Sequence, residues 1–192
     1  MTRSESNKTK EDNDQGQVWN FKGRFADYMR ELTTGDSDEY KKIFDTIYHG
    51  YAFCALYGLL KGRRHIYDPK IDNPDDSRQQ GFRWAYADSS GLYSYESLRK
   101  MILLFDKTSN CTFEEKIDRA LRFDFQASDV TDDELKSKAK YKENGEIIDE
   151  YVLGGLELLH SKISKFNSSS DIIEFMNDTL KEFQDTIDKL KS

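Results

Sequence analysis

The stretch YKKIFDTIYHGYAFCALYGLLKGRR, residues 40–64, decides the fold of this chain. Apolar residues recur from Tyr40 to Leu59 at the i, i+3, i+4, i+7 spacing of an amphipathic helix. From Tyr51 onward apolar side chains fill the other faces too, which predicts a second half that is buried on all sides. Residues 40–60 are therefore the expected central helix.

The central helix is expected to end at the cationic run Lys61-Gly62-Arg63-Arg64. Glycine readily adopts the left-handed conformation that closes a helix, and cations are favoured at the negative end of the helix dipole. A second interpretation is an anion site formed by Lys61, Arg63, Arg64, Arg83 and Trp84. Arginine and an aromatic ring are what phosphate contact and base stacking require. Both interpretations stay open from the sequence.

Similar periodicity predicts further helices over residues 18–32, 93–105, 112–125, 147–166 and 171–190. Thr112 and Glu115 form a capping box at the start of one of them. The alternation in GFRWAYA, residues 81–87, indicates a short strand, with HIYDPKI, residues 65–71, as its partner. The expected fold class is mainly α: a single domain of about five to six packed helices with a small β-hairpin within residues 64–88.

Residues 1–17 are polar and are expected to form a disordered tail, which leaves residues 18–192 as one helical domain. Residues 128–146 are almost without apolar side chains, which indicates a polar linker or a short exposed helix. Gly154 and Gly155 fall inside a buried helical pattern, at a cost of about 2 kcal/mol relative to alanine. Either the helix breaks there or another backbone approaches closely, and Gly58 on the central helix is the natural counterpart.

The chain has 192 residues and a net charge of −7, with Lys+Arg 29 against Asp+Glu 36. This balance does not favour long-range steering towards nucleic acid, although a local basic patch could bind it. The longest nearly apolar run, residues 51–60, is about half the length that a bilayer requires. The start of the chain lacks the apolar region of a signal peptide. We therefore expect a cytoplasmic protein without a membrane partner.

No cofactor or metal site is expected, because His49, His65 and His160 are far apart and no Cys-x-x-Cys pair occurs. Pro74-Asp75 followed by Glu114-x-Lys116 matches the order of a Pro-Asp…Glu-x-Lys nuclease constellation. Glu114, however, lies in the first turn after a Thr cap, where the helix dipole alone favours negative charge. The sequence therefore does not favour an enzyme.

The last helix carries apolar residues at 3-4-3-4-3 spacing, a strict a/d seam. Such a seam either packs on its own domain or docks onto a helix of another chain. The candidate partner interface is formed by Ile173, Met176, Leu180, Phe183, Ile187 and Leu190.

Two segments together resemble a known family. IFDTIYHGYAFCALYGLLKGRRHIYDP, residues 43–69, and EIIDEYVLGGLELLHSKI, residues 146–163, are similar to the two signatures of the "Dnd system-associated protein 4" type. These small proteins are encoded beside bacterial DNA phosphorothioation (Dnd) genes. The matching positions are Gly62, Arg63, Arg64, Tyr151, Gly154, Gly155, Leu156 and Glu157.

The resemblance implies an accessory protein of a phage-defence or DNA-modification island, and it supplies no activity. The expected function is therefore a non-enzymatic accessory subunit that docks on a larger protein of such a system. The alternative is a nucleic-acid-binding module that uses residues 61–64 with Arg83 and Trp84.

Overall fold

Helices dominate the computed structural model, which describes residues 18–34, 42–74, 79–83, 95–121 and 132–191. Within these ranges lie seven helices and one two-stranded antiparallel sheet, which confirms the expected mainly α class with a small sheet. The elements follow in the order β1 (Val18–Lys22), α1 (Arg24–Thr34), α2 (Ile47–Lys61), α3 (Pro69–Asp72), β2 (Gln79–Arg83), α5 (Tyr95–Phe105), α6 (Phe113–Leu121), α7 (Asp132–Ile163) and α8 (Ser169–Lys191).

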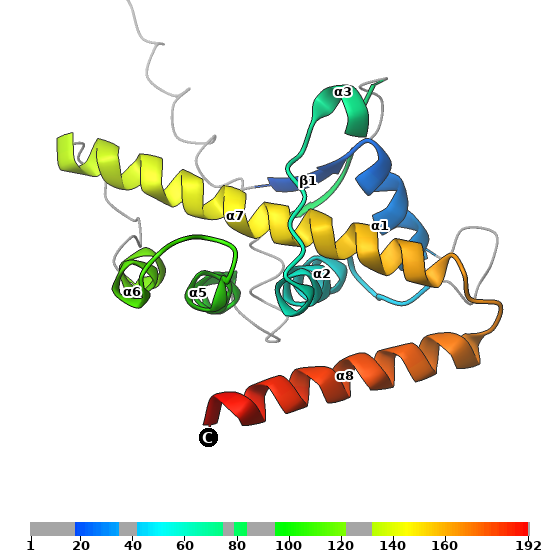
Figure 1. The fold of residues 1–192 in the computed structure, drawn as a ribbon. Coiled ribbons are helices and arrows are strands. Elements are labelled where there is room, and N and C mark those ends of the chain that lie inside the picture. The colour runs from blue at the N-terminus through cyan, green and yellow to red at the C-terminus, as the bar shows by residue number, and fades with distance from the viewer. Residues whose placement is uncertain (1–17, 35–41, 75–78, 84–94, 122–131, 192) are drawn as a thin grey trace, which may run out of the picture.

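Helix α7 runs across the molecule, with α2, α5 and α6 on one side of it and β1 and α1 on the other (Figure 1). The core is centred where α2 crosses α7, and Tyr51, Cys54, Tyr151 and Leu156 are fully buried there. Because the Cys54 side chain is enclosed, burial raises the pKa of its thiol, as expected for a core residue rather than a nucleophile. Helix α8 lies along the far side of α2 (Figure 1).

The chain begins differently from the sequence prediction. A helix was expected over residues 18–32, but residues 18–22 are strand β1, and a turn at Gly23, with φ of 54°, leads into α1. Trp19 and Phe21 are two residues apart, so they share one face of a strand, and both rings contact Tyr51 at 4.8 and 6.5 Å between centroids. Packing of these rings on α2 therefore decides between strand and helix.

The partner of the second strand also differs from the prediction. Strand β2 pairs with β1, Trp19 opposite Phe82, whereas residues 65–71 were expected to be its partner. That segment instead leads into α3, because Asp68 accepts a hydrogen bond from the Lys70 N–H at 2.9 Å and Pro69 occupies the first helical position. Of the alternating stretch 81–87, residues 84–87 lie outside the described ranges.

Helix α2 begins later than expected and ends where expected. The Thr46 side chain caps it by accepting the His49 N–H at 3.1 Å, and residues 42–46 are not helical. The N–H groups of Ile43 and Phe44 instead bond to the carbonyl of Leu32, at 2.8 and 3.0 Å. At the other end Gly62 adopts the left-handed conformation, φ 60°, and its N–H returns to the carbonyls of Gly58 and Leu59, which confirms the expected helix stop.

Helix α7 is one continuous helix of 32 residues. Residues 128–146 were expected to form a polar linker or a short exposed helix, but residues 132–146 are the first half of α7. The stretch contains no proline, and Lys142 pairs with Glu146, four residues later on the same face of the helix, at 3.9 Å. A polar sequence is compatible with a long helix when its other half is anchored in the core.

The paired glycines of α7 are explained by close backbone approach, as one of the two alternatives predicted. A Cβ on Gly155 would lie 2.8 Å from the Gly58 nitrogen and nearer still to the Cys54 carbonyl oxygen. A Cβ on Gly58 would lie 3.0 Å from the carbonyl carbon of Tyr151, and closer to its oxygen. The helix does not break, and Gly58 is the counterpart, because each glycine makes room for the other helix.

Three smaller predictions concern the start of helix α6, membrane-spanning helices and the polar residues 1–17. The Thr112–Glu115 capping box is confirmed, since the Thr112 N–H donates to the Glu115 carboxylate at 2.7 Å and the Glu115 N–H donates to the Thr112 hydroxyl at 3.2 Å. In the described part of the chain, every helix is too short or too polar to cross a membrane. The expected tail, residues 1–17, lies outside the described ranges.

Candidate functional site

The first candidate is the Gly-Arg-Arg loop, residues 61–65, which leaves α2 and crosses the surface of α7. The His65 N–H donates to the carbonyl of Glu150 on α7 at 2.9 Å. Gly154 provides the space for this crossing, since a Cβ there would lie 2.8 Å from the carbonyl carbon of Arg63. The two segments that resemble family signatures are therefore the two sides of one contact: the loop and α2 on one side, the paired glycines of α7 on the other.

Every cation of this loop pairs with a carboxylate of the same chain. Arg64 Nε donates to Glu150 Oε2 at 2.7 Å, and Arg63 Nη2 lies 3.2 Å from Glu157 Oε2. Lys61 pairs with Glu182 on α8. The Gly-Arg-Arg loop thus acts as a clasp across α7.

A buried acid lies next to this clasp. Asp72, at the end of α3, is 1% exposed and accepts from Arg24 Nε at 2.8 Å, while His65 Nε2 lies 2.9 Å from its other oxygen. Burial alone would raise the pKa of Asp72, but the hydrogen bonds from His65 and the Asp68 N–H, together with the charge of Arg24, lower it overall. Arg24 also reaches Glu157 at 3.1 Å. Two arginines, Arg24 and Arg63, thus meet two carboxylates, Asp72 and Glu157, so both arginine charges of this cluster are paired within the chain.

A second polar cluster, formed by Asp106, Thr108 and Tyr151, also holds the Gly-Arg-Arg loop. Asp106 accepts hydrogen bonds from the Tyr151 hydroxyl and from the backbone and side chain of Thr108, at 2.9 and 2.7 Å for Thr108. Burial would raise the pKa of Asp106, but these hydrogen bonds outweigh it and hold that pKa at about 2. Burial and the bond to Asp106 raise the pKa of Tyr151 to about 12. Arg64 Nη1 donates to Thr108 at 2.9 Å, so this cluster joins the clasp to the end of α5.

The other two residues of the expected anion site, Arg83 and Trp84, lie partly or wholly outside the described part of the chain. Arg83 ends strand β2, where its backbone pairs with Val18, and its side chain lies outside the description, as does the whole of Trp84. The structure therefore places Lys61, Arg63 and Arg64 in ion pairs and gives no arrangement for the other two.

The nuclease constellation is likewise incomplete among the described residues, since Asp75 lies outside them. Glu114 is exposed in the first turn of α6, and Lys116 donates to the backbone carbonyl of Asp106. Within the described ranges no group of three or more histidine, cysteine or acidic side chains is arranged to hold a metal ion.

The second candidate is the predicted apolar seam of α8, whose described residues fall into an exposed group and a half-buried group. Ile173, Leu180 and Ile187 are 61%, 57% and 47% exposed, and we call them the α8 apolar row. Met176 and Phe183 are half-buried, and the ring of Phe183 contacts Phe53 of α2 at 6.5 Å between centroids. The side chain of the sixth seam residue, Leu190, is not described.

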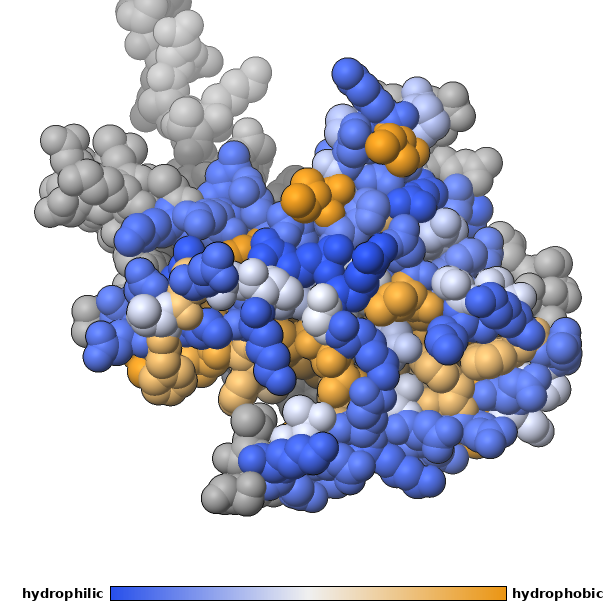
Figure 2. Space-filling model, in the orientation of Figure 1, coloured by the Kyte–Doolittle hydropathy of each residue, from blue (hydrophilic) through white to orange (hydrophobic). Residues whose placement is uncertain are grey.

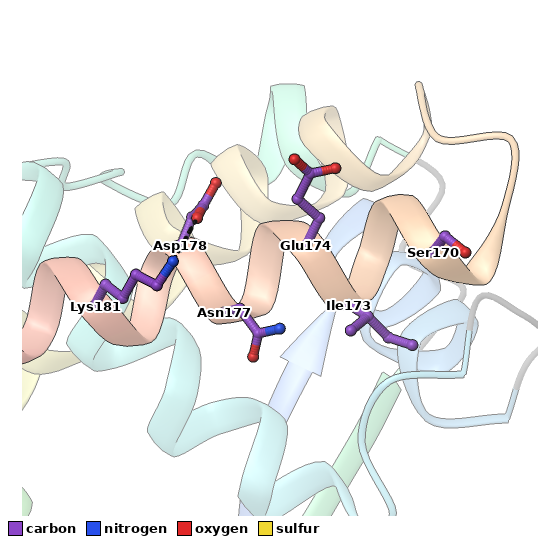
Figure 3. A pocket seen from close by; sticks show the side chains of 6 residues that line it. All are labelled: Ser170, Ile173, Glu174, Asn177, Asp178 and Lys181. Carbon is purple, nitrogen blue, oxygen red and sulfur yellow. Dashed lines mark ion pairs between the residues drawn. The ribbon is translucent and has the colours of Figure 1, made fainter.

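The face of α8 that packs on α2 is shifted by one residue from the predicted seam. Ile172 and Thr179 are buried on it, and Phe175 contacts Tyr57 of α2 at 5.9 Å between centroids. The apolar row lies on the shoulder of this packed face, towards solvent. Beside it, a shallow hollow of about 370 Å³ is lined by Ser170, Ile173, Glu174, Asn177, Asp178 and Lys181 (Figure 3).

Sequence reasoning missed the acidic partners of the loop, Glu150 and Glu157. A signal was present, because the two glutamates are seven residues apart and so occupy one face of a helix, with the paired glycines between them. It also missed Asp149, which accepts from Trp19 Nε1 at 2.8 Å and from the Tyr51 hydroxyl at 3.3 Å. Comparison of the chain with protein-family models, with curated proteins and with solved structures gave no match.

Proposed function

We propose that this protein is a non-enzymatic adaptor subunit that docks on a larger protein through the α8 apolar row. The observation that carries the proposal is the exposure of Ile173, Leu180 and Ile187, at intervals of seven residues, on a helix whose other face already packs on α2. In helix pairs, apolar side chains at the a and d positions of each seven-residue repeat are the knobs that pack into the facing helix, and the row occupies one of these two positions. Helix-in-groove recognition uses the same kind of anchor.

The Gly-Arg-Arg loop gives a second argument for this proposal, because it argues against an anion-binding role for the loop. Its arginines are engaged with Glu150 and Glu157, so contact with an external anion would first have to break ion pairs inside the protein. Nucleic-acid binding by residues 61–64 therefore has less support than docking through α8.

The kind of system rests on the sequence resemblance alone. In this proposal the partner is a larger protein of a bacterial DNA-modification or phage-defence complex. The adaptor would contribute a contact surface to that complex, and no catalytic step.

The test is affinity capture of the tagged full-length protein from its native host, followed by quantification of the proteins that co-purify. We expect a larger protein in near-stoichiometric amount with the wild type and its loss with Leu180→Asp/Ile187→Asp. A matched control is Phe113→Asp/Leu121→Asp on α6, which replaces two apolar residues that are 69% and 54% exposed. Equal recovery with the α8 variant, or a wild-type protein that is recovered alone, would refute the proposal.

A further inference from the structure

Helix α8 does not turn its most apolar side towards the rest of the protein. Five buried or half-buried residues form one line along it, and we call them the α8 inner line: Ile172, Phe175, Thr179, Glu182 and Thr186. Three of these five residues are polar, whereas all six residues of the predicted seam are apolar. At about 100° per residue, the centres of the two lines are roughly 90° apart around the helix. A helix on a protein surface normally buries its apolar stripe, so α8 is docked away from its most favourable side.

Aromatic side chains span the space between α8 and α2. The ring of Phe175 lies 5.9 Å from that of Tyr57, and the ring of Phe183 lies 6.5 Å from that of Phe53, measured between centroids. At the crossing of α2 and α7, by contrast, the backbones approach so closely that Gly155 has no room for a Cβ. Release of α8 would therefore break side-chain contacts and leave the α2–α7 crossing intact.

The contact between α8 and α2 is open to solvent. Lys61 of α2 pairs with Glu182 of the inner line, and these side chains are 34% and 45% exposed. Exposed ion pairs hold two segments together only weakly, because water competes for both charges and salt screens them. In the orientation of Figure 2, hydrophilic side chains cover the outer face of α8, and apolar side chains remain visible in the band between α8 and the helices above it.

The contacts that start and support helix α8 lie within its own segment. The Asp171 N–H donates to the Ser168 hydroxyl at 3.3 Å, and the Ser168 N–H donates to the Asp171 carboxylate at 3.0 Å, which is a capping box. Near the other end, Gln184 donates to Asp188 at 3.0 Å. Residues 164–168, between α7 and α8, are not helical and can serve as a hinge. Helix α8 can therefore leave α2 without losing its capped start.

We infer that α8 is a displaceable cover of α2, which exchanges between the docked form and a released form. Release uncovers Phe53 and Tyr57 of α2 and presents the whole seam of α8, including the half-buried Met176 and Phe183. As a way of regulating the docking surface, this exchange rests on the proposed function. The release itself requires no partner, and it belongs to the local openings that proteins undergo below the free energy of global unfolding.

The direct test compares the labelling rates of two thiols in one chain. Thr179→Cys places a thiol on the inner line, where the native side chain is 3% exposed, and Cys54 is fully buried between α2 and α7. Cys111→Ser removes the partly exposed third thiol. The full-length double variant is treated with excess maleimide, and mass spectrometry follows each site, with rates normalised to those of the urea-unfolded chain. We expect the thiol of Thr179→Cys to react at least about a hundredfold faster than Cys54, because it needs only the release of α8.

A pair of lysine variants tests the link between α8 and α2. Lys61→Ala removes the ion pair with Glu182, and we expect it to speed labelling of Thr179→Cys about two- to fivefold while the Cys54 rate stays the same. Lys42→Ala breaks an exposed ion pair away from α8 and should change neither rate. Hydrogen exchange of the unsubstituted protein gives a second measurement, in which residues 169–191 should exchange faster than residues 147–163.

Equal normalised rates for Thr179→Cys and Cys54 would overturn the inference, because α8 would then leave only on global unfolding. Equal hydrogen-exchange protection of residues 169–191 and 147–163 would overturn it as well. These outcomes are distinct from those of affinity capture. A captured partner that needs Leu180, together with equal labelling rates, keeps the adaptor role and removes the displaceable helix. Fast labelling of Thr179→Cys without any captured partner does the reverse.

Discussion

Gly155 of α7 and Gly58 of α2 face each other across the crossing of the two helices. A Cβ on Gly155 would lie 2.8 Å from the backbone nitrogen of Gly58. This separation is shorter than real Cβ atoms tolerate against backbone, so the crossing depends on the absence of a side chain. The Gly-Arg-Arg loop follows directly from this crossing and closes over α7.

Gly155→Ala is expected to destabilise the protein by about 3 kcal/mol, because α2 and α7 must move apart to admit the methyl group. Gly145→Ala is the matched control within α7, since a Cβ there meets nothing within 4 Å. Alanine favours a helix over glycine by about 1 kcal/mol, so this control should be slightly stabilising. Urea unfolding of both variants measures the difference, and a Gly155→Ala protein as stable as the wild type would contradict the crossing.

Arg64→Ala is expected to cost about 2 kcal/mol of unfolding free energy, because it leaves the partly buried carboxylate of Glu150 without its charged donor. Arg64→Lys should restore only part of the loss, since lysine lacks the fork that reaches both Glu150 and Thr108. Lys42→Ala, which breaks the exposed 3.7 Å pair with Asp45, serves as a near-neutral control. An equal loss of unfolding free energy in Arg64→Ala and Lys42→Ala would show that the Arg64 ion pair stabilises the protein no more than an exposed ion pair does.

The full-length protein is expected to bind duplex DNA more weakly than about 1 µM at physiological salt. The reason is that Lys61, Arg63 and Arg64 are paired within the chain and that the net charge is −7. A gel-shift or anisotropy titration against salt checks this. Sub-micromolar binding that collapses with Arg63→Ala/Arg64→Ala would instead favour the nucleic-acid alternative.

Asp149 predicts a pH dependence of stability between about pH 4 and pH 6. Burial raises the pKa of Asp149 to about 6, and the charges of Glu146 and Glu150 raise it further, against the hydrogen bonds from Trp19 and Tyr51. The folded protein therefore holds this proton to a higher pH than the unfolded chain. Its unfolding free energy should fall by about 3 kcal/mol as the pH rises from 4 to 7.

Asp149→Asn should flatten this part of the stability curve, because asparagine stays neutral and can still accept from Trp19. Urea unfolding at a series of pH values measures the slope. The low pKa of Asp106, about 2, acts in the opposite direction and in a separate window, below pH 4. Parallel curves for the wild type and Asp149→Asn between pH 4 and 7 would contradict the assigned pKa.

Part of this fold was accessible from the sequence. The central helix, its stop at Gly62 and the counterpart relation of Gly58 with Gly155 follow from local rules, because glycine placement reports where backbones approach. The strand at residues 18–22 was not accessible, since Trp19, Phe21 and Phe25 fit a helical period nearly as well as a strand period. Its structure is decided by packing against Tyr51, a residue distant in sequence.

The candidate site could likewise be predicted from the sequence only in part. The seam of α8 was visible as a 3-4 repeat, but the repeat does not tell which side faces the domain. That side is set by Phe53 and Tyr57 of α2, which attract Phe183 and Phe175 and leave Ile173, Leu180 and Ile187 outside. The acidic partners of Arg63 and Arg64 were missed for a related reason, because the seven-residue spacing of Glu150 and Glu157 places both on one face of a helix but does not tell which cations that face meets.

One measurement tests the central claim most directly: the yield of the larger protein captured with Leu180→Asp/Ile187→Asp, compared with that captured with folded Arg63→Ala/Arg64→Ala. The first variant changes the surface that faces outward, and the second changes the clasp that faces α7. We predict that the partner is lost with the α8 variant and retained with the arginine variant. Retention with the α8 variant and loss with the arginine variant would contradict the account and place the contact at the Gly-Arg-Arg loop.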